Sequence, residues 1–564
     1  PDFNPSGFGS VGSLSEAIGA TDTNVQFTDN LSWNTRKHNI RAGFTISPKR
    51  YNEITDFSGN PAFNFDGRFT GMQGLGLGDM LLGLPFTASG ALGDSSQEMR
   101  TTFYAGYVQD DWRIAPNLTL NLGMRYEYSA SPTEQRGKAE AFAPDAGAIV
   151  LANHGVRASI VDPDWNNFAP RVGFAYRPGF LKNTVLRSGF GIYYATDNWN
   201  ELQFEVNGPP FYQSQTLTSD PTKPTLLMSN LLPSFSASAN LNPFTFDRHN
   251  RTPYVSQWSF GVEHTFKQDY LVDVEYVGST GQKLPERRNL NAAALDPTGT
   301  VALAARRPFP LFGNILLAYN GGWSSYNALT TRFEKRFSSG FYLLASYTWE
   351  KSLDLGSTDE FSTLGSSFKN YDKGNSSFDV PHRFVYSYIY ELPFGRGKRF
   401  GGSVDPIVNT IVGGWQLSGI TTFSKGQFGS ASVGVDWVNI GSFDASRPNI
   451  IGPLAAGRSL PDSYVNPLAF DYPRGATGQP IHVEGNAGRN TIEQPGINNW
   501  DLGVFKNTVV HERFNVQFRW EMFNAWNHTQ FGPANLSMTS ASVGRITSTL
   551  IGPRRMQFGL RLRF

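Results

Sequence analysis

The sequence predicts an all-β protein, an antiparallel barrel whose strands cross a membrane. Three observations predict this fold. Apolar and polar residues alternate with a period near two along most of the chain, as in strands with one apolar and one polar face. The alternating segments run about 10 to 14 residues, which exceeds the roughly five or six of soluble strands and suits a tilted membrane crossing. Short turns and long links also follow one another in regular order, as in outer-membrane barrels.

The composition favours one membrane-embedded domain over residues 1–564 rather than several soluble domains. Charged residues make up 17% of the chain, against about 25% in ordinary soluble proteins. Aromatic residues reach 14% and glycine numbers 58, so rings and glycine take the place of surface charge. The longest apolar stretches, 146–152 and 314–319, fall short of the ~18 to 20 residues that a spanning helix needs, which excludes a helical membrane protein.

Charge and cysteine content exclude several other classes of protein. The 48 basic and 47 acidic residues give a formal net charge of +1 and are spread along the chain, so we expect no nucleic-acid partner. The absence of cysteine excludes disulfides, thiolate metal sites and cysteine catalysis. The first residue is Pro1 rather than Met, which indicates a removed signal peptide or a fragment.

The alternation is clearest in four segments. In 118–128, apolar residues and tyrosine at even positions alternate with polar residues and glycine at odd positions. Segments 258–266, 270–276 and 514–522 show the same pattern. Extended along the chain, this pattern predicts about fifteen strands. They are 24–33, 36–46, 102–113, 117–129, 169–177, 184–196, 253–266, 269–279, 324–337, 340–351, 380–392, 413–425, 497–507, 511–525 and 554–564.

The connections predict how these strands sit in the membrane, because outer-membrane barrels have short periplasmic turns and long extracellular loops. Short turns are predicted at 34–36, 115–117, 178–183, 266–269, 338–340 and 508–511, with a longer turn at 395–414 on the same side. Long links are predicted at 47–101, 130–168, 197–252, 280–323, 352–379, 426–496 and 526–553. We therefore expect the long links to be extracellular loops.

The strand count predicts a barrel without its N-terminal part. The last strand runs toward the periplasm, and by the alternation the first strand runs the same way, so the number of strands is odd. Bacterial single-chain barrels close with an even number and keep both ends in the periplasm. We therefore expect at least one ascending strand before Pro1.

The last strand carries a candidate assembly signal. Its outward row begins at Met556 and ends the chain on an aromatic residue. Four of its members resemble the C-terminal signal that the barrel-assembly machinery reads in outer-membrane proteins, and the alternative is an ordinary strand that happens to end the protein. They are Phe558, Leu560, Leu562 and Phe564.

Aromatic residues gather toward the predicted strand ends, as Tyr347 and Trp349 illustrate. Amphipathic rings favour the headgroup layer, so these rings predict aromatic girdles, with the core of a soluble sandwich as the alternative. Lys335 interrupts an apolar row close to a periplasmic end, where its long side chain can reach the interface. Asp29 interrupts an outward row without such a route, which weakens the prediction of its strand.

The opposite rows carry charges of both signs, which predicts a polar lumen that holds water or packs against a plug. We expect most of these residues to be structural and a minority to touch a substrate. The candidate lumen-facing residues are Arg125, Glu127, Glu263, Asp273, Glu275, Arg332, Glu334, Arg383, Glu391, Asp501, Arg519, Glu521, Arg561 and Arg563.

Motifs for catalysis, cofactors and metals are missing from the sequence. It has no zinc-protease helix motif, no nucleophile elbow and no phosphate-binding loop, so we expect no enzyme activity, no cofactor and no metal site. Asp162, Asp164 and Asn166 share the opening spacing of a calcium loop. Asn167 occupies the position that requires glycine, so solvated loop acids are the preferred interpretation.

Several strings of residues resemble those of one membrane-protein family. They are YVQDDW at 107–112, FDVPHRF at 378–384, YELPFG at 390–395, GGWQLSG at 413–419, PGINNWD at 495–501, FNAWNH at 523–528 and GRI at 544–546. With them the chain resembles the TonB-dependent transporters of the outer membrane, specifically the Oar-like β-barrel type. The resemblance covers most of the chain from about residue 24 to its end.

The resemblance implies a barrel of about 22 strands with a plug inside it. It also implies a periplasmic TonB box, through which an inner-membrane complex applies the proton-motive force. Nothing here resembles the plug, the TonB box or the carboxypeptidase-regulatory-like domain that often precedes them. We therefore expect that the plug and about seven strands lie outside this chain.

The leading hypothesis is energy-coupled import of a scarce solute, a siderophore, cobalamin, glycan or peptide, by an integral outer-membrane barrel. The long loops would capture the solute, with mere covering of the lumen mouth as the alternative. The implied partners are outer-membrane lipid, the barrel-assembly machinery, the solute, and the TonB energising complex acting through a plug. A surface adhesin or a secretion-associated barrel without a plug is the competing hypothesis. An outer-membrane hydrolase comes third, because no Ser, His and acid spacing singles one out.

Overall fold

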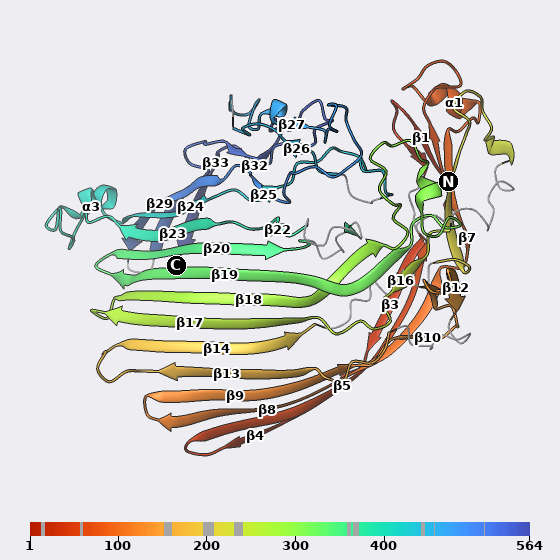
Figure 1. Cartoon of the computed structure of the whole chain (residues 1–564). Coiled ribbons are helices and arrows are strands. Elements are labelled where there is room, and N and C mark those ends of the chain that lie inside the picture. Colours follow the sequence, from red (N-terminus) through yellow and green to blue (C-terminus); the bar gives the residue numbers. More distant parts are fainter. Residues whose placement is uncertain are drawn as a thin grey trace.

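The computed structural model describes the backbone of residues 1–564 except for ten short stretches. Those stretches are 13–16, 57–59, 152–160, 196–207, 231–240, 358–362, 365–371, 442–445, 456 and 512–513. Strands dominate the described residues (Figure 1). No helix among them is long and apolar enough to cross a membrane.

One large antiparallel sheet contains the fifteen long strands of the described residues, and each strand pairs with the next in the chain. They are β4 (Phe27–Asn34), β5 (His38–Asp56), β8 (Ser96–Ala115), β9 (Leu118–Ser129), β13 (Phe168–Tyr176), β14 (Thr184–Tyr194), β17 (Tyr254–Phe266), β18 (Tyr270–Asn289), β19 (Leu316–Ser338), β20 (Phe341–Asp354), β23 (His382–Glu391), β24 (Trp415–Ser424), β29 (Ile497–His511), β30 (Phe514–Phe523) and β33 (Arg555–Arg563). Every predicted strand is present, in the predicted order.

The sheet has two free edges in the part of the chain that the structure describes. β33 pairs with β30 on one side, and β4 pairs with β5 on the other. β3 (Ala17–Asn24) continues the β4 edge, because it pairs with the far half of β5. No described pairing joins β33 to β3 or β4, so the described strands form an open, curved wall (Figure 1).

Four strands are longer than the sequence predicted. β5, β8, β18 and β19 continue by six to ten residues beyond their predicted ends on the side of the long links. The β18–β19 ladder, for example, persists to the Asn289–Leu316 pair, past register shifts near Leu284. The alternation fades there; in β5, for example, residues 48–53 are largely polar on both faces, so that no apolar row marks the strand. The predicted ends were therefore wrong for these four strands.

The two ends of the sheet differ as predicted. At one end, which we call the short-turn end, tight turns join neighbouring strands, and one longer turn contains α3 (Pro406–Val412). At the other, the long-link end, long segments leave the sheet and return. Pro1 lies at the long-link end and Phe564 at the short-turn end (Figure 1).

The long links contain structure that the sequence did not predict. A second sheet joins the chain start to two links through β1 (Asp2–Pro5), β2 (Val11–Gly12), β6 (Ala62–Phe65), β7 (Thr87–Gly93) and β15 (Tyr212–Thr218). Short strands in the other links include β10 (Thr133–Glu134), β11 (Glu140–Ala143), β12 (Ala148–Leu151), β16 (Phe244–Phe246), β22 (Gly374–Asn375), β26 (Asn449–Ile450), β28 (Ile492–Glu493) and β31 (Gln530–Phe531). These links have hydrophobic cores of their own, one around Phe65 and Ala88 and a larger one around Val465 and Ile492.

Candidate functional site

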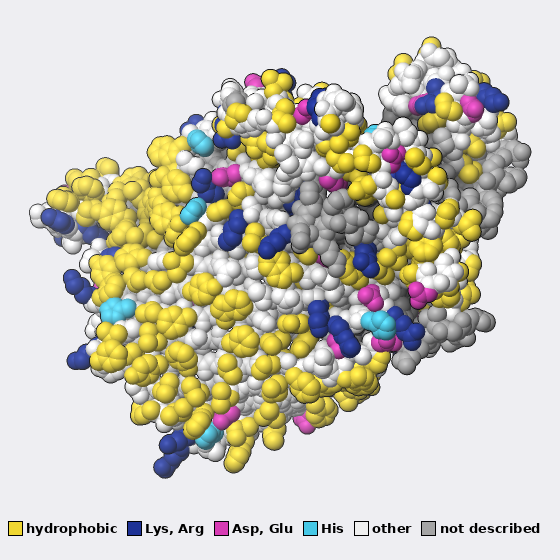
Figure 2. All heavy atoms as spheres, in the orientation of Figure 1, with side chains coloured by type: hydrophobic (Ala, Val, Ile, Leu, Met, Phe, Trp, Pro, Cys, Tyr) yellow, Lys and Arg dark blue, Asp and Glu magenta, His cyan; other side chains and the backbone are white. Residues whose placement is uncertain are grey.

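The large sheet has one apolar and one polar face. Directly paired residues of antiparallel strands lie on the same face. One such cross-strand row is Phe260, Tyr276, Leu329 and Trp349, and all four side chains are exposed. In Figure 2, apolar side chains spread over the strands of the visible face with few charges among them.

The register places all fourteen candidate lumen-facing residues on the other face. Arg125, for example, pairs with Tyr107, and the row of Glu263 continues through Asp273 and Arg332. The same stepwise pairing leads across the sheet to Arg383, Glu391, Asp501, Arg519, Glu521, Arg561 and Arg563. We call this surface the polar face.

Ion pairs bring several of these candidates together. Arg125 contacts Glu127, and Arg332 Nη2 lies 2.5 Å from Glu334 Oε2. Glu391 binds Lys398 at the short-turn end at 2.8 Å. Two of these contacts join residues two apart on one strand, and the third joins the end of β23 to the turn that follows it.

Other candidates bind neutral groups or stand alone. Asp501 accepts hydrogen bonds from Asn499 and from the backbone N–H of Asn524, and Glu521 accepts one from Gln557. Among the fourteen candidates, three arginines have no side-chain hydrogen bond or ion pair with the described residues. They are Arg383, Arg561 and Arg563.

Several arginines of the polar face were missing from the candidates, among them Arg187 and Arg171. Arg187 Nη2 lies 2.5 Å from Asp273 Oδ2, and its Nη1 lies 3.5 Å from Glu263, so it bridges two predicted residues. Arg171 lies on the neighbouring strand β13. Their strands carry glycine at the adjacent polar positions, so the alternation in which an arginine would be noticed is weak there.

A hollow of about 660 Å³ opens on the polar face. It follows two adjacent cross-strand rows across the sheet. One row is Gln109, Gly123, Arg171, Gly191, Gln257, Ser279 and Tyr326, and the other is Asn121, Gly173, Gly189, Ser259 and Val277. Gly173 and Gly189 lie side by side in one row, and Gly123 and Gly191 flank Arg171 in the other, so the missing side chains create the space.

The groups around this hollow suit a polar ligand. The Arg171 guanidinium lies 4.6 Å from the centre of the Tyr193 ring, and no described group accepts a hydrogen bond from its buried Nε. Gly191 leaves room for this ring, since a β-carbon there would lie 3.0 Å from it. Amides, hydroxyls and Glu275 complete the lining. The hollow therefore offers the Arg171 cation, the Tyr193 ring, the Glu275 carboxylate and many neutral hydrogen-bonding groups.

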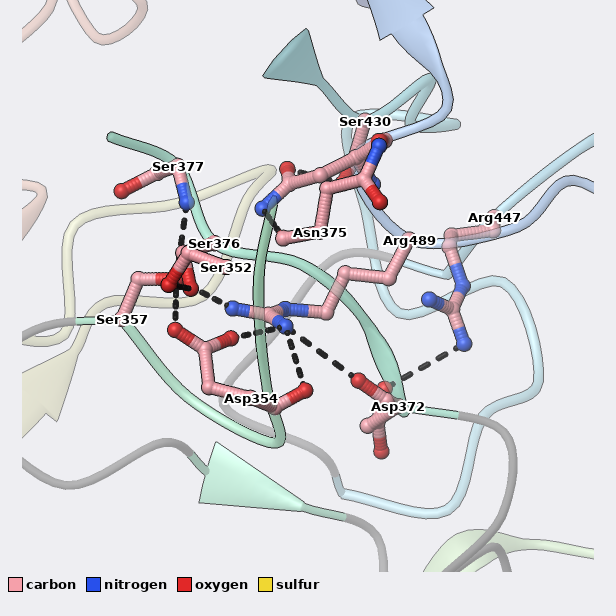
Figure 3. A network of polar contacts seen from close by, with 11 residues as sticks. Ser352, Asp354, Ser357, Asp372, Asn375, Ser376, Ser377, Ser430, Arg447 and Arg489 are labelled. Atoms are coloured by element: carbon pink, nitrogen blue, oxygen red, sulfur yellow. Dashed lines mark hydrogen bonds and ion pairs between the residues drawn. The ribbon is translucent and has the colours of Figure 1, made fainter. Parts of the chain in front are cut away.

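The long links are tied to one another by buried polar contacts. Arg489 reaches the segment after β20, where its Nη1 lies 2.6 Å from Asp354 Oδ1 and its Nη2 donates to Ser357 Oγ at 2.6 Å (Figure 3). Nη1 also donates to the backbone oxygens of Asp354 and Asp372. One guanidinium thus holds two segments that lie far apart in the sequence.

Further contacts strengthen this junction. Arg447 Nη2 lies 3.2 Å from Asp372 Oδ1. Asn375 and Asn490 exchange hydrogen bonds between their side-chain amides and backbone oxygens, at 2.9 and 2.7 Å (Figure 3). Ser430 donates to the Asn490 side chain at 2.9 Å. The junction thus joins the segment between β20 and β23 to the link between β24 and β29 through several polar contacts.

Of the residues of the rejected calcium loop, Asn166 is exposed and Asp162 is half-buried, whereas Asp164 is not solvated, contrary to the prediction. Asp164 is buried and accepts hydrogen bonds from Arg251 and from the backbone N–H of Thr252. Asp162 pairs with Arg248 at 3.2 Å. The acids serve as ion-pair partners between two links. No group of three metal-ligating side chains occurs among the described residues.

The two charged residues that interrupt apolar rows of the predicted strands behave differently. Lys335 Nζ donates to the backbone oxygens of Ser338 and Phe341, at 3.0 and 2.9 Å, so its charge reaches the short-turn end as predicted. Asp29 lies on the apolar face beside its partner Phe44, and its strand is present.

The last strand presents its predicted row to the outside of the sheet. Phe558 and Leu560 pair with Trp520 and Phe518 of β30, and the Phe558 ring lies 6.0 Å from that of Trp520. The members of this row are all exposed, up to the final Phe564.

Comparisons with known proteins agree with this architecture. The sequence matches the family described as "Outer membrane beta barrel domain" over residues 1–557. The outer membrane transporter YddB from Escherichia coli superposes with a TM-score of 0.53 at 11% sequence identity, covering 97% of this chain and 54% of that one. The siderophore receptor PirA from Acinetobacter baumannii gives a TM-score of 0.45 at 9% identity, covering 94% and 54%. No curated protein matches the chain.

The family match and the shared fold confirm, at the level of family and fold, the resemblance to outer-membrane receptors found in the sequence. They also agree with the prediction that the chain is not an enzyme. This chain spans about half the length of the Escherichia coli transporter. The protein belongs to the outer membrane beta barrel domain family and is integral to the outer membrane.

Proposed function

We propose that this chain forms part of the barrel wall of a TonB-dependent importer, with its polar face toward the lumen and its long links outside the cell. The observation that carries the proposal is the division of one continuous sheet into an apolar face and a charged face. Lipid requires the first and a polar passage the second. The proposal includes the fourteen charged candidates as lumen residues, most of them structural.

The proposal also includes further strands and a plug that are not part of this chain. Further strands would close the wall between β33 and β4, and a plug with a TonB box would fill it. The two free edges and the roughly twofold greater length of the Escherichia coli transporter support this. Energy from the inner membrane would then act through the plug rather than through the residues described above.

The solute would be polar. The hollow beside Arg171 provides a cation, hydroxyls and amides, which suit carboxylate or hydroxyl groups of a siderophore, cobalamin, glycan or peptide. We propose that the hollow is a station on the lumen wall below the loop layer.

Uptake measurements test the importer proposal. Cells that express the full protein would receive radiolabelled ferric citrate, cyanocobalamin, maltodextrin or a hexapeptide, with and without the TonB energising complex. At least one probe should accumulate only when that complex is present, because the plug must be moved to open the lumen. Equal accumulation in both strains would contradict energy coupling. Cells without the protein are the control.

Removal of Phe564 tests the proposed assembly signal. We expect the truncated protein to reach the outer membrane in clearly reduced amounts, because the assembly machinery would no longer find the terminal aromatic residue of the apolar row. The heat-modifiable band on gels measures the folded fraction. Phe514→Ala, which removes another exposed ring of the apolar face, is the control. An undiminished band for the truncated protein would mean that Phe564 only ends a strand.

A further inference from the structure

The turn between β23 and β24 differs from every other connection at the short-turn end of the described chain. The other strands there are joined by tight turns, whereas residues 392–414 form an extended turn that contains α3. α3 projects beyond the ends of the strands (Figure 1). Neighbouring strands can be joined without such a helix, which indicates another role for α3.

The helix exposes its aliphatic side chains. Ile407 is 76% exposed and Ile411 68%, and Val408 and Val412 are also exposed. Residues four apart lie on the same side of a helix, so these side chains form one apolar stripe. Apolar side chains gather over this turn with basic side chains beside them (Figure 2). A stripe of this kind is unfavourable in water.

The opposite side of the helix is held by the protein. Asn409 Oδ1 accepts a hydrogen bond from the backbone N–H of Arg396 at 2.6 Å, and Asp405 caps the helix start by accepting from the backbone N–H of Ile407. A β-carbon at Gly413 would lie 2.5 Å from Asn409 Oδ1, so glycine allows this close packing. The polar side is therefore fastened inward, and the apolar stripe is left to face outward.

The helix is also fastened to the apolar face of the sheet. Trp415 Nε1 donates to the backbone oxygen of Ile411 at 2.8 Å. Lys506, which pairs with Trp415, donates to the backbone oxygen of Gly413 at 2.5 Å. Both side chains belong to the apolar rows, since Gln416 and Phe505 lie on the polar face. The stripe is thus continuous with the surface that contacts lipid.

The charges of the turn complement a phospholipid surface. Arg396, Lys398 and Arg399 precede the helix, while Asp405 is the only acid within 392–414. Arg399 lies over the Phe400 ring at 5.4 Å, and the exposed Phe394 and Phe400 rings lie 5.6 Å apart. Basic residues beside exposed apolar residues are typical of helices that lie in a membrane interface.

We propose that residues 394–412 form an interfacial anchor, in which Ile407 and Ile411 insert into the lipid leaflet at the short-turn end. Arg396 and Arg399 then lie at the phosphates of anionic phospholipids. The anchor fixes the height and tilt of this side of the barrel in the membrane. It is independent of the proposed transport function, because it depends only on the lipid-facing surface.

Spin labelling tests the anchor, and the absence of cysteine from the chain makes every introduced cysteine a unique label. Ile407→Cys and Ile411→Cys variants of the full protein would be labelled separately with a nitroxide. They would be reconstituted in vesicles of phosphatidylcholine and phosphatidylglycerol. Leu468→Cys, at an 83% exposed position in a long link, is the matched control. Power saturation then compares collision with oxygen, which partitions into lipid, with collision with a water-soluble nickel chelate.

We expect labels at 407 and 411 to be several-fold more accessible to oxygen and several-fold less accessible to the nickel chelate than the label at 468. Replacing Arg396, Lys398 and Arg399 with Gln should make the insertion depth insensitive to the phosphatidylglycerol fraction. Nickel accessibility equal to that at 468 would mean that the stripe lies in water and would overturn the proposal. Shielding from both reagents would mean that another protein or a second copy covers the stripe, which would also overturn it.

Discussion

Replacing Arg489 with alanine is expected to detach the segment that follows β20 from the link between β24 and β29. The Arg489 and Asp354 side chains are only 13% and 4% exposed. Removing the guanidinium leaves the Asp354 carboxylate buried without its cation and removes the hydrogen bond that Ser357 Oγ accepts from Arg489. Loss of one partner of a buried ion pair costs about 3–5 kcal/mol. The cost should appear as local opening, because the large sheet does not depend on this contact.

Hydrogen exchange of the backbone amides measures this opening. We expect protection of residues 352–357 and 374–376 to fall strongly in Arg489→Ala, with little change in β19 or in residues 341–351 of β20. Arg474→Ala is the control, because its ion pair with Asp471 is exposed, and such pairs contribute only about 0–1 kcal/mol. Similar exchange in the two variants would show that the Arg489 contacts do not hold the links together.

The strands could be predicted from the sequence wherever the two faces of the sheet meet different surroundings. In β9 lipid on one side and polar groups on the other impose the period of two that the sequence shows. The far half of β5, from Pro48 to Asp56, pairs with β3 and β8 above this zone and carries polar residues on both faces. The β5–β8 hydrogen-bonded ladder continues without a register shift through this half, but the side chains no longer alternate between apolar and polar, so the strand cannot be recognised from the sequence.

The small sheets of the long links could not be predicted, because they depend on partners far away in the chain. β1 pairs in parallel with β6, some sixty residues later, and β7 pairs with β15 more than a hundred residues later. Strands of two to seven residues have too few alternating positions to be recognised. Which segments meet is decided by the register of the large sheet, which brings the starts of the links together.

In the candidate site, too, features that depend on local alternation could be predicted, and features that depend on strand pairing could not. The charged residues were found because alternation assigns each to a face, and the register places them together. The hollow beside Arg171 requires that Gly173 and Gly189 become neighbours, which only the register between β13 and β14 establishes. The position of Lys335 could be predicted because its contacts lie within the next turn.

One buried carboxyl should make the stability of the link between β9 and β13 depend on pH. Glu140 in β11 is 2% exposed, and neither of its carboxyl oxygens has a hydrogen-bond partner among the described residues. Burial therefore raises the pKa of Glu140 to about 9, from about 4.5 in the unfolded chain. Below pH 4.5 both states carry the proton. Between about pH 4.5 and 9 only the folded link retains it, so the folded link becomes less stable as the pH rises through this range.

Each pH unit in this range lowers the free energy of unfolding of the link by about 1.4 kcal/mol, which amounts to roughly 4 kcal/mol between pH 5 and pH 8. Hydrogen exchange of residues 138–151 at these two pH values, corrected for the intrinsic exchange rate, measures the loss. Glu140→Gln should abolish the slope and protect the link at pH 8, because the amide keeps the neutral side chain at every pH.

Glu134→Gln, in β10 of the same link, provides the matched control. The Glu134 carboxylate accepts hydrogen bonds from the backbone N–H groups of Glu98, Arg136 and Lys138. Its replacement should weaken the link while leaving the slope caused by Glu140 in place. If Glu140→Gln retained the wild-type slope, another group would have to titrate in this link. The contrast between the two substitutions thus separates a carboxyl that destabilises the folded link when it ionises from one whose hydrogen bonds hold the link together.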